Sequence, residues 1–124
     1  MNIPPVPHAV LLDQRRRKEE YARDNPAVAV FEQIKEQVHL FGKHLEDGEA
    51  LGIQLLGSGS EARLKIQTIG YATPSIIYFD GETADGNFAR LLQNVSQLSV
   101  MLVAVTLRAG EEKRPIGFVY PESE

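Results

Sequence analysis

The sequence contains no cysteine among its 124 residues. That absence excludes disulfide bonds, thiolate metal sites, iron–sulfur clusters and cysteine nucleophiles. Long apolar runs are missing too, because the longest, Leu98 to Leu107, reaches only about half of the ~20 residues that a membrane-spanning helix needs. The N-terminus has no basic stretch leading into an apolar one, so we expect no secretory signal. We therefore expect a cytoplasmic protein that does not bind a membrane.

The composition is that of one globular domain. Apolar residues make up 43% and charged residues 24% of the chain, which is ordinary for a folded protein. The net charge of -4 is unevenly placed: residues 1–25 hold five basic and four acidic residues, and the remainder holds eight basic and thirteen acidic ones. We predict a weakly basic N-terminal arm (1–25), a single α+β domain (26–120) and a short acidic tail (121–124).

The N-terminal arm begins with three prolines in nine residues, which favours an extended segment because proline fixes φ and has no N–H. Good helix formers follow, and they predict a helix from Val10 to Asp24. Within it lies a basic run that consists of Arg15, Arg16, Arg17 and Lys18. Clustered arginine and lysine can contact phosphates, but two glutamates follow at once and the domain is acidic. We favour a solvated helix face, or an arm that docks on the acidic body of a neighbouring subunit, over a nucleic-acid site.

The clearest pattern in the chain is an apolar stripe at helical spacing. It consists of Ala27, Phe31, Ile34, Val38, Phe41 and Leu45. Steps of three and four residues place these side chains on one helix face. Asp24 or Asn25 as cap and Pro26 in the first turn mark the start, and Gly48 marks the end. We predict a long amphipathic helix over about residues 26–47 that lies on a sheet, with a seam that could also pair with a second copy.

After this helix the apolar period changes to two, which is typical of strands. Residues 51–55 and 62–68 alternate on either side of Gly57-Ser58-Gly59-Ser60, and they predict an antiparallel hairpin with one face in water. A third strand is expected at 76–79 and a closing strand at 116–120.

Residues 86–98 are ambiguous, because their apolar residues fit either a helix face or a strand at 88–94. The turn signal Asp85-Gly86 between apolar runs makes us favour the strand.

Residues 100–105 are apolar without alternation, which is typical of a central strand covered on both faces. One helix covers one face of a sheet, so the other face needs another cover. That cover is the arm, the ambiguous segment if it is helical, or a second subunit. Since symmetric dimers are the commonest assemblies, we predict a homo-oligomer built from a dimer. The fold class we expect is α+β, with N-terminal helices packed on a mainly antiparallel sheet of five or six strands.

No familiar catalytic motif is visible. His39 and His44 are five residues apart, so on a helix they point about 140° away from each other and do not form a metal-binding pair. Asp80 and Asp85 lie near glycines, where turns favour aspartate, although a small hydrolase could use them as acid and base. We expect no catalytic residue, no metal and no cofactor.

One group of polar residues is the best candidate for ligand binding. Amide side chains together with arginine and tyrosine can hydrogen-bond and stack on a small polar ligand. Alternatively, these residues satisfy sheet edges or a turn. The group consists of Tyr71, Arg90, Gln93, Asn94, Gln97 and Arg108.

Six short segments carry a resemblance to a known family. They are Asn25-Pro26-Ala27, Ile69-Gly70-Tyr71, Asp85-Gly86-Asn87, Val95-Ser96-Gln97-Leu98, Leu102-Val103-Ala104-Val105 and Ile116-Gly117-Phe118. With them the chain resembles an uncharacterised family of small bacterial and phage-associated proteins, a domain of unknown function. The resemblance covers about residues 25–119 and leaves the arm outside. It implies an intact domain of bacterial or phage origin, and it implies no activity.

The function we predict is that of a non-catalytic, homo-oligomeric binding protein that captures a small anionic, nucleotide-like ligand at a subunit interface. Small phage proteins that sequester defence signals would share these features, so by analogy the expected setting is conflict between phage and bacteria. One alternative is binding of nucleic acid or a protein partner through the basic arm. Another is a small hydrolase that uses Asp80 and Asp85.

Overall fold

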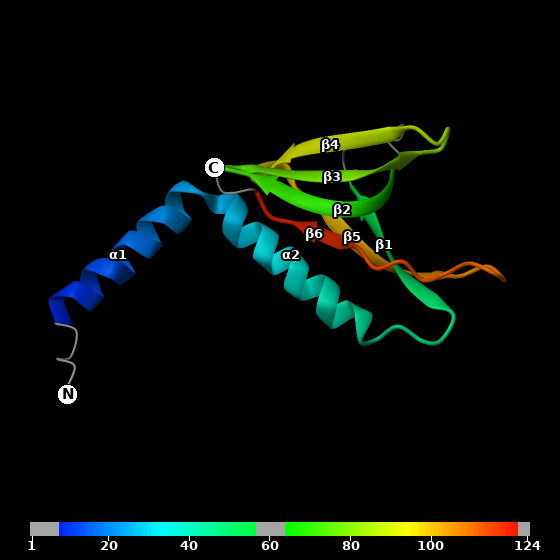
Figure 1. Ribbon diagram of the computed structural model, residues 1–124, viewed down its shortest axis with the longest axis horizontal. Coiled ribbons are helices and arrows are strands. Elements are labelled where there is room, and N and C mark those ends of the chain that lie inside the picture. The colour runs from blue at the N-terminus through cyan, green and yellow to red at the C-terminus, as the bar shows by residue number, and fades with distance from the viewer. Residues whose placement is uncertain (1–7, 57–63, 122–124) are drawn as a thin grey trace, which may run out of the picture.

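The computed structural model describes residues 8–56 and 64–121 and has an α+β architecture (Figure 1). Two N-terminal helices precede the strands, and the fold class predicted from the sequence is confirmed. The elements are α1 (His8–Asp24), α2 (Pro26–Gly42), β1 (Glu49–Leu55), β2 (Leu64–Ala72), β3 (Ile76–Thr83), β4 (Phe88–Asn94), the short 3-10 helix η1 (Val95–Gln97), β5 (Val100–Thr106) and β6 (Gly117–Val119).

The strands form two sheets rather than one. The larger sheet has the order β4-β3-β2-β6, and β1 and β5 form a separate two-stranded sheet. Strand pairs are antiparallel except for β2 and β6, which run parallel. The proline-rich start at 1–7, the glycine-serine segment at 57–60 and the tail beyond residue 121 lie outside the described residues.

The first helix confirms the helix predicted over residues 10–24, and it extends away from the sheets (Figure 1). Its side chains are exposed from Ala9 to Asp24, among them Leu11 (49%) and Tyr21 (56%). At its end, the backbone N–H and the side-chain amide of Asn25 both donate to the carbonyl of Tyr21, at 2.9 and 3.0 Å. The helix therefore gains little from tertiary packing, which is the main source of helix stability in proteins.

The second helix starts where the sequence predicted, with Pro26 in its first turn. Asn25 does not cap it through its side chain. Instead, the N–H of Ala27 donates to the carbonyl of Pro74, at 3.0 Å. This bond satisfies a first-turn donor and ties the start of the helix to the turn between β2 and β3.

The second helix ends at Gly42, so the predicted end near residue 47 is wrong. The N–H groups of Lys43 and His44 donate to carbonyls only three residues back, at 3.2 and 3.0 Å. Such bonds tighten the last turn and end an α-helix. Gly48, with φ of 84°, lies in the left-handed region just before β1, where glycine is favoured.

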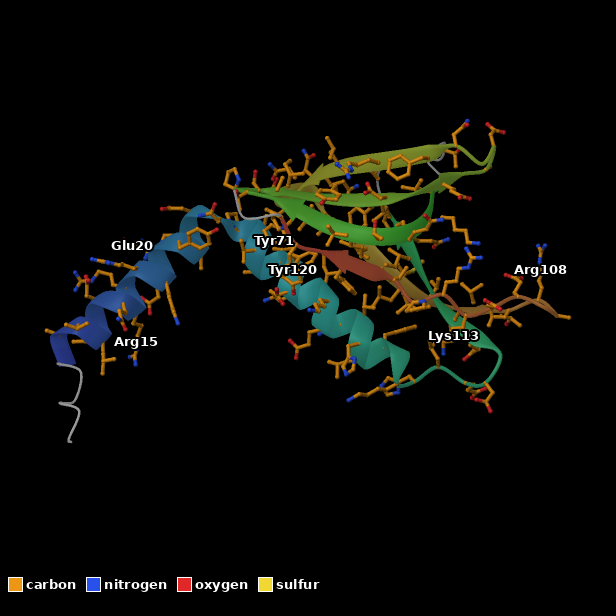
Figure 2. All side chains as sticks on the ribbon, viewed as in Figure 1. Arg15, Glu20, Tyr71, Arg108, Lys113 and Tyr120 are labelled. Carbon is orange, nitrogen blue, oxygen red and sulfur yellow. The ribbon has the colours of Figure 1, made fainter. Side chains whose placement is uncertain are left out.

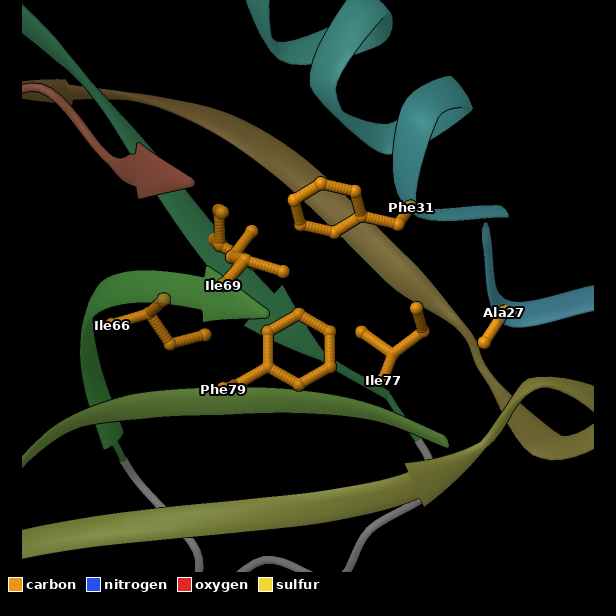
Figure 3. Packing of buried hydrophobic residues seen from close by; sticks show 7 residues of the cluster. Ala27, Phe31, Ile66, Ile69, Ile77 and Phe79 are labelled. Atoms are coloured by element: carbon orange, nitrogen blue, oxygen red, sulfur yellow. The ribbon is translucent and has the colours of Figure 1, made fainter. Parts of the chain in front are cut away.

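The core lies between α2 and the larger sheet. Phe31 points from the helix towards Ile69 and Phe79, and Ala27 lies beside Ile77 (Figure 3). Burial of one such phenylalanine or isoleucine contributes roughly 1.5–3 kcal/mol. The buried apolar residues are Ala27, Phe31, Ile53, Ile66, Ile69, Ile77 and Phe79.

The hairpin predicted from residues 51–55 and 62–68 is wrong. β1 pairs with β5, and its apolar residues Leu51 and Ile53 lie opposite Ala104 and Leu102. β2 pairs with β3 and β6 instead. The alternation of apolar residues identified the two strands but not their partners. The partner of β1 is β5, which places its own apolar residues beside those of β1.

The predicted strand at 100–105 is confirmed as β5, but its placement as a central strand is wrong. In the described part of the chain β5 pairs with β1 alone. On its outer face Met101 is 39% and Val105 is 46% exposed. The sequence predicted that this strand has two apolar faces. The outer face of β5 is apolar, and it is exposed in the described part of the chain.

The segment at 86–98 forms β4 followed by η1, which confirms the favoured strand. The closing strand β6 is confirmed over Gly117–Val119, shorter than the expected 116–120. Neither described helix has the length and apolar content to cross a membrane.

Candidate functional site

Arg90, one of the predicted ligand-binding residues, is held by contacts within the sheet. Its guanidinium donates two hydrogen bonds to Asp80, from Nε to Oδ1 at 2.6 Å and from Nη2 to Oδ2 at 2.9 Å. It also lies over the Tyr78 ring, 4.1 Å from the centroid. The hydrogen bond with Asp80 is the main reason that the pKa of Arg90 is raised. Bidentate pairing of this kind is strong and directional, so Arg90 serves to join β4 to β3.

The amide residues near Arg90 also act locally. The side-chain carbonyl of Asn94 accepts hydrogen bonds from the N–H and the hydroxyl of Ser96, at 3.0 and 2.9 Å, and so caps η1. Its side-chain amide donates to the hydroxyl of Ser75, at 3.2 Å. Gln97 is exposed, whereas Gln93 Oε1 is buried and has no hydrogen-bond partner among the described residues.

Tyr71 and Arg108 lie elsewhere, so the structure does not bring the six predicted residues together. The Tyr71 ring packs against Phe31, with centroids 4.8 Å apart, and burial raises the pKa of its hydroxyl. Arg108 is exposed at the far end of the molecule (Figure 2), and its Nε lies 3.9 Å from a carboxylate oxygen of Glu111.

The basic run of the arm lies on α1. Successive helical residues turn by about 100°, so Arg15, Arg16, Arg17 and Lys18 do not share one face. Arg17 pairs with Asp13 at 3.1 Å, and Figure 2 shows Arg15 at the opposite end of the molecule from Lys113.

The acidic residues considered for hydrolysis are not assembled for it. Both carboxylate oxygens of Asp80 accept hydrogen bonds from Arg90. Asp85 lies in the exposed turn between β3 and β4. Among residues 8–56 and 64–121, no three histidine, aspartate or glutamate side chains lie close enough to hold a metal ion.

A cavity of about 630 Å³ lies between α2, β1 and the segment that leads into β6. Its apolar part is continuous with the core, because Val38, Leu51, Ile116 and Phe118 also pack against the core residues. A volume of this size falls in the range of small-molecule sites, which are mostly apolar with a few polar groups. The lining residues are Lys35, Val38, His39, Gly42, Lys43, Leu45, Leu51, Lys113, Arg114, Pro115, Ile116 and Phe118.

Basic side chains surround this apolar cavity. α2 and the turn after it contribute Lys35, His39 and Lys43, and the segment before β6 contributes Lys113 and Arg114. The described lining includes no carboxylate. In a chain whose net charge is -4, the four lysine and arginine side chains around one cavity form a local positive field.

Lys35 is fixed at one side of the cavity by a short chain of hydrogen bonds. Its ammonium donates to the hydroxyl of Tyr120 at 2.8 Å, and that hydroxyl donates to Oε1 of Glu32 at 2.9 Å. The ammonium also lies 5.0 Å from the centre of the Tyr120 ring. The hydrogen bond with Tyr120 is the main cause that raises the pKa of Lys35. Lys35 is therefore positively charged at neutral pH.

Sequence reasoning missed this cavity, although one signal was available. Lys35, His39 and Lys43 are four residues apart, so they form a basic stripe along one side of the helix beside the apolar stripe. The contribution of Lys113 and Arg114 had no local signal, because the two residues reach the cavity only through the pairing of β6 with β2.

Comparison with protein families, characterised proteins and solved structures found no match to this chain. The family resemblance noted in the sequence therefore stays a prediction, and the functional argument depends on the geometry of the cavity.

Proposed function

We propose that this protein is a non-catalytic binding protein that captures a small anionic ligand in the cavity between α2 and β6. The observation that carries the proposal is an apolar cavity of about 630 Å³ with five basic side chains around it and no carboxylate in its described lining. An apolar wall selects a ligand with an apolar or aromatic body, and the basic groups select a negative charge at one end.

The charged groups differ in what they offer a ligand. Arg114 presents a planar fork that matches a phosphate or carboxylate in two hydrogen bonds. Lys43 and Lys113 act as point charges on long, exposed side chains. A nucleotide-like molecule combines the two requirements, because its base is flat and its phosphate is anionic.

The same lining favours binding over chemistry. General acid–base catalysis needs positioned proton donors and acceptors, and nucleophilic catalysis needs an activated nucleophile. His39 is the one imidazole of the described lining, and no hydroxyl or carboxylate lines the cavity with it.

The test is a fluorescence titration with anilinonaphthalene sulfonate, an aromatic probe with one negative charge. The wild-type chain is compared with a Lys113→Gln, Arg114→Gln double variant. The matched control is Arg15→Gln, Arg16→Gln, which removes the same charge from α1. We expect the cavity variant to raise the Kd of the probe about tenfold, equivalent to about 1.4 kcal/mol, and the α1 variant to leave it unchanged.

Competition then defines the ligand class. Adenosine monophosphate should displace the probe from the wild type, whereas adenosine should displace it far less, because only the first carries the phosphate. Equal weakening by the two double variants would show that net charge alone governs binding. That result, or a wild type that does not bind the probe, would overturn the proposal.

A further inference from the structure

The free edge of β5 presents a row of backbone groups without partners in the described fold. Along an antiparallel pair, alternate residues bond to the neighbouring strand and the others face away. Leu56 N–H donates to the carbonyl of Ser99, and Leu107 N–H donates to the carbonyl of Gly48. In the register of β1 with β5, odd-numbered residues of β5 therefore bond to β1. The even-numbered residues present their N–H and C=O groups at the open edge, and these are Val100, Leu102, Ala104 and Thr106.

This edge has none of the features that usually block strand addition. Protected edges carry lysine, proline, bulges or a covering element. From Val100 to Thr106 the strand has no charge, no proline and no register shift. Two other antiparallel edge strands of the described fold carry a charge: Arg90 interrupts β4, and β1 begins with Glu49.

We propose that the β5 edge binds the β5 edge of a second copy of this chain, antiparallel and about a two-fold axis at Val103. That axis places Leu102 of one copy opposite Ala104 of the other, and Val100 opposite Thr106. These even-numbered residues are the ones that carry the open N–H and C=O groups, so the pairing satisfies them in both copies. The result is a continuous four-stranded sheet with the order β1-β5-β5-β1.

The side chains are self-complementary in the same register. On the outer face, Met101 of one copy lies opposite Val105 of the other, and Val103 meets Val103. The pairing thus gathers the apolar residues that the single chain leaves exposed, at 39% for Met101 and 46% for Val105. A two-stranded sheet is marginal in water, and a second copy supplies the further strands that such a sheet lacks.

A proline substitution tests the edge while leaving the fold intact. Ala104 directs its N–H to the open edge, so Ala104→Pro removes no bond between β1 and β5 but blocks pairing with a second strand. Leu92→Pro is the matched control, because Leu92 holds the equivalent outward position on the β4 edge. Sedimentation of the full chain should show a dimer for the wild type and for Leu92→Pro, and a monomer for Ala104→Pro.

A charge exchange tests the register. Met101→Lys alone and Val105→Glu alone should each weaken the dimer, because each places two charges in the apolar contact. The double variant should restore it, because each lysine then lies opposite a glutamate of the other copy. Within one strand the two positions are four residues apart, too far to pair with each other.

The outcomes separate this proposal from ligand capture. A dimer that Ala104→Pro abolishes, and that the double charge variant restores, supports pairing through β5. A wild-type monomer at micromolar concentration, or a dimer that Leu92→Pro and not Ala104→Pro disrupts, would overturn it. The probe titration of the cavity variants reports on ligand capture separately, because the lining includes no residue of β5.

Discussion

At the scale of single residues, the pairing of Asp80 with Arg90 is the main polar contact of the larger sheet. Asp80 is only 8% exposed, and Arg90 supplies both of its hydrogen bonds. We expect Arg90→Gln to lower the free energy of unfolding, since it leaves a buried carboxylate with weaker partners. Urea denaturation measures the difference.

The matched control for this prediction is Arg17→Gln. Arg17 pairs with Asp13 on α1, where the two side chains are 77% and 51% exposed. Exposed pairs contribute little, so this variant should change stability by less than about 1 kcal/mol. If Arg90→Gln had an equally small effect, or if it weakened probe binding at the cavity, Arg90 would have a different role from the one assigned here.

Tyr71 gives the molecule a stability that depends on pH. Burial raises the pKa of its hydroxyl above the ordinary value of 10.0, so the folded state holds this proton more tightly than the unfolded state does. That contribution is complete below pH 10.0 and is lost as the pH rises towards the folded pKa. We expect the wild type to lose more free energy of unfolding above pH 10.0 than Tyr71→Phe does. If the free energy of unfolding fell equally with pH above pH 10.0 in the two proteins, this role of Tyr71 would be contradicted.

The residues of the cavity show the limit of sequence reasoning at this scale. The sequence predicts a binding group from its amide, arginine and tyrosine side chains, whereas Arg90 joins two strands and Asn94 caps η1. Polar residues in strands can bind a ligand or form hydrogen bonds within the sheet, and only the pairing of the strands decides between these two roles. The basic stripe at Lys35, His39 and Lys43 was readable, but its partners on the segment before β6 were not.

At the scale of elements, α1 is the least supported part of the described fold. It is exposed along its length, and isolated helices of this length are marginal in water. Hydrogen exchange should therefore find fast exchange for the amides of α1 and slow exchange for those around Phe31 in α2. Similar protection of the two helices would show that α1 packs against something in solution.

Local patterns predicted the elements well because helices and half-buried strands have fixed periods. The helix that starts at Pro26 and the strand at 88–94 both followed from such patterns. Strand pairing did not, because nothing local in residues 51–55 indicates that their partner lies at 100–106. The same non-local pairing explains why β5 is an edge strand instead of a central one.

At the scale of the whole molecule, the two proposals concern different surfaces of the described fold: the basic cavity and the edge of β5. The cavity is built from α2, β1 and the segment before β6, whereas the edge belongs to β5 alone. Ligand capture and self-association can therefore be tested independently. The sequence predicted both properties in general form, and the structure provides a specific surface for each proposal.

The central claim is that a small anion binds between α2 and β6. The most direct measurement records two-dimensional amide nuclear magnetic resonance spectra while anilinonaphthalene sulfonate is added. We expect the largest shifts on the amides of Val38, Gly42 and Ile116, which line the cavity. Shifts centred on Arg90 and Gln93, or no shifts at saturating probe, would contradict it.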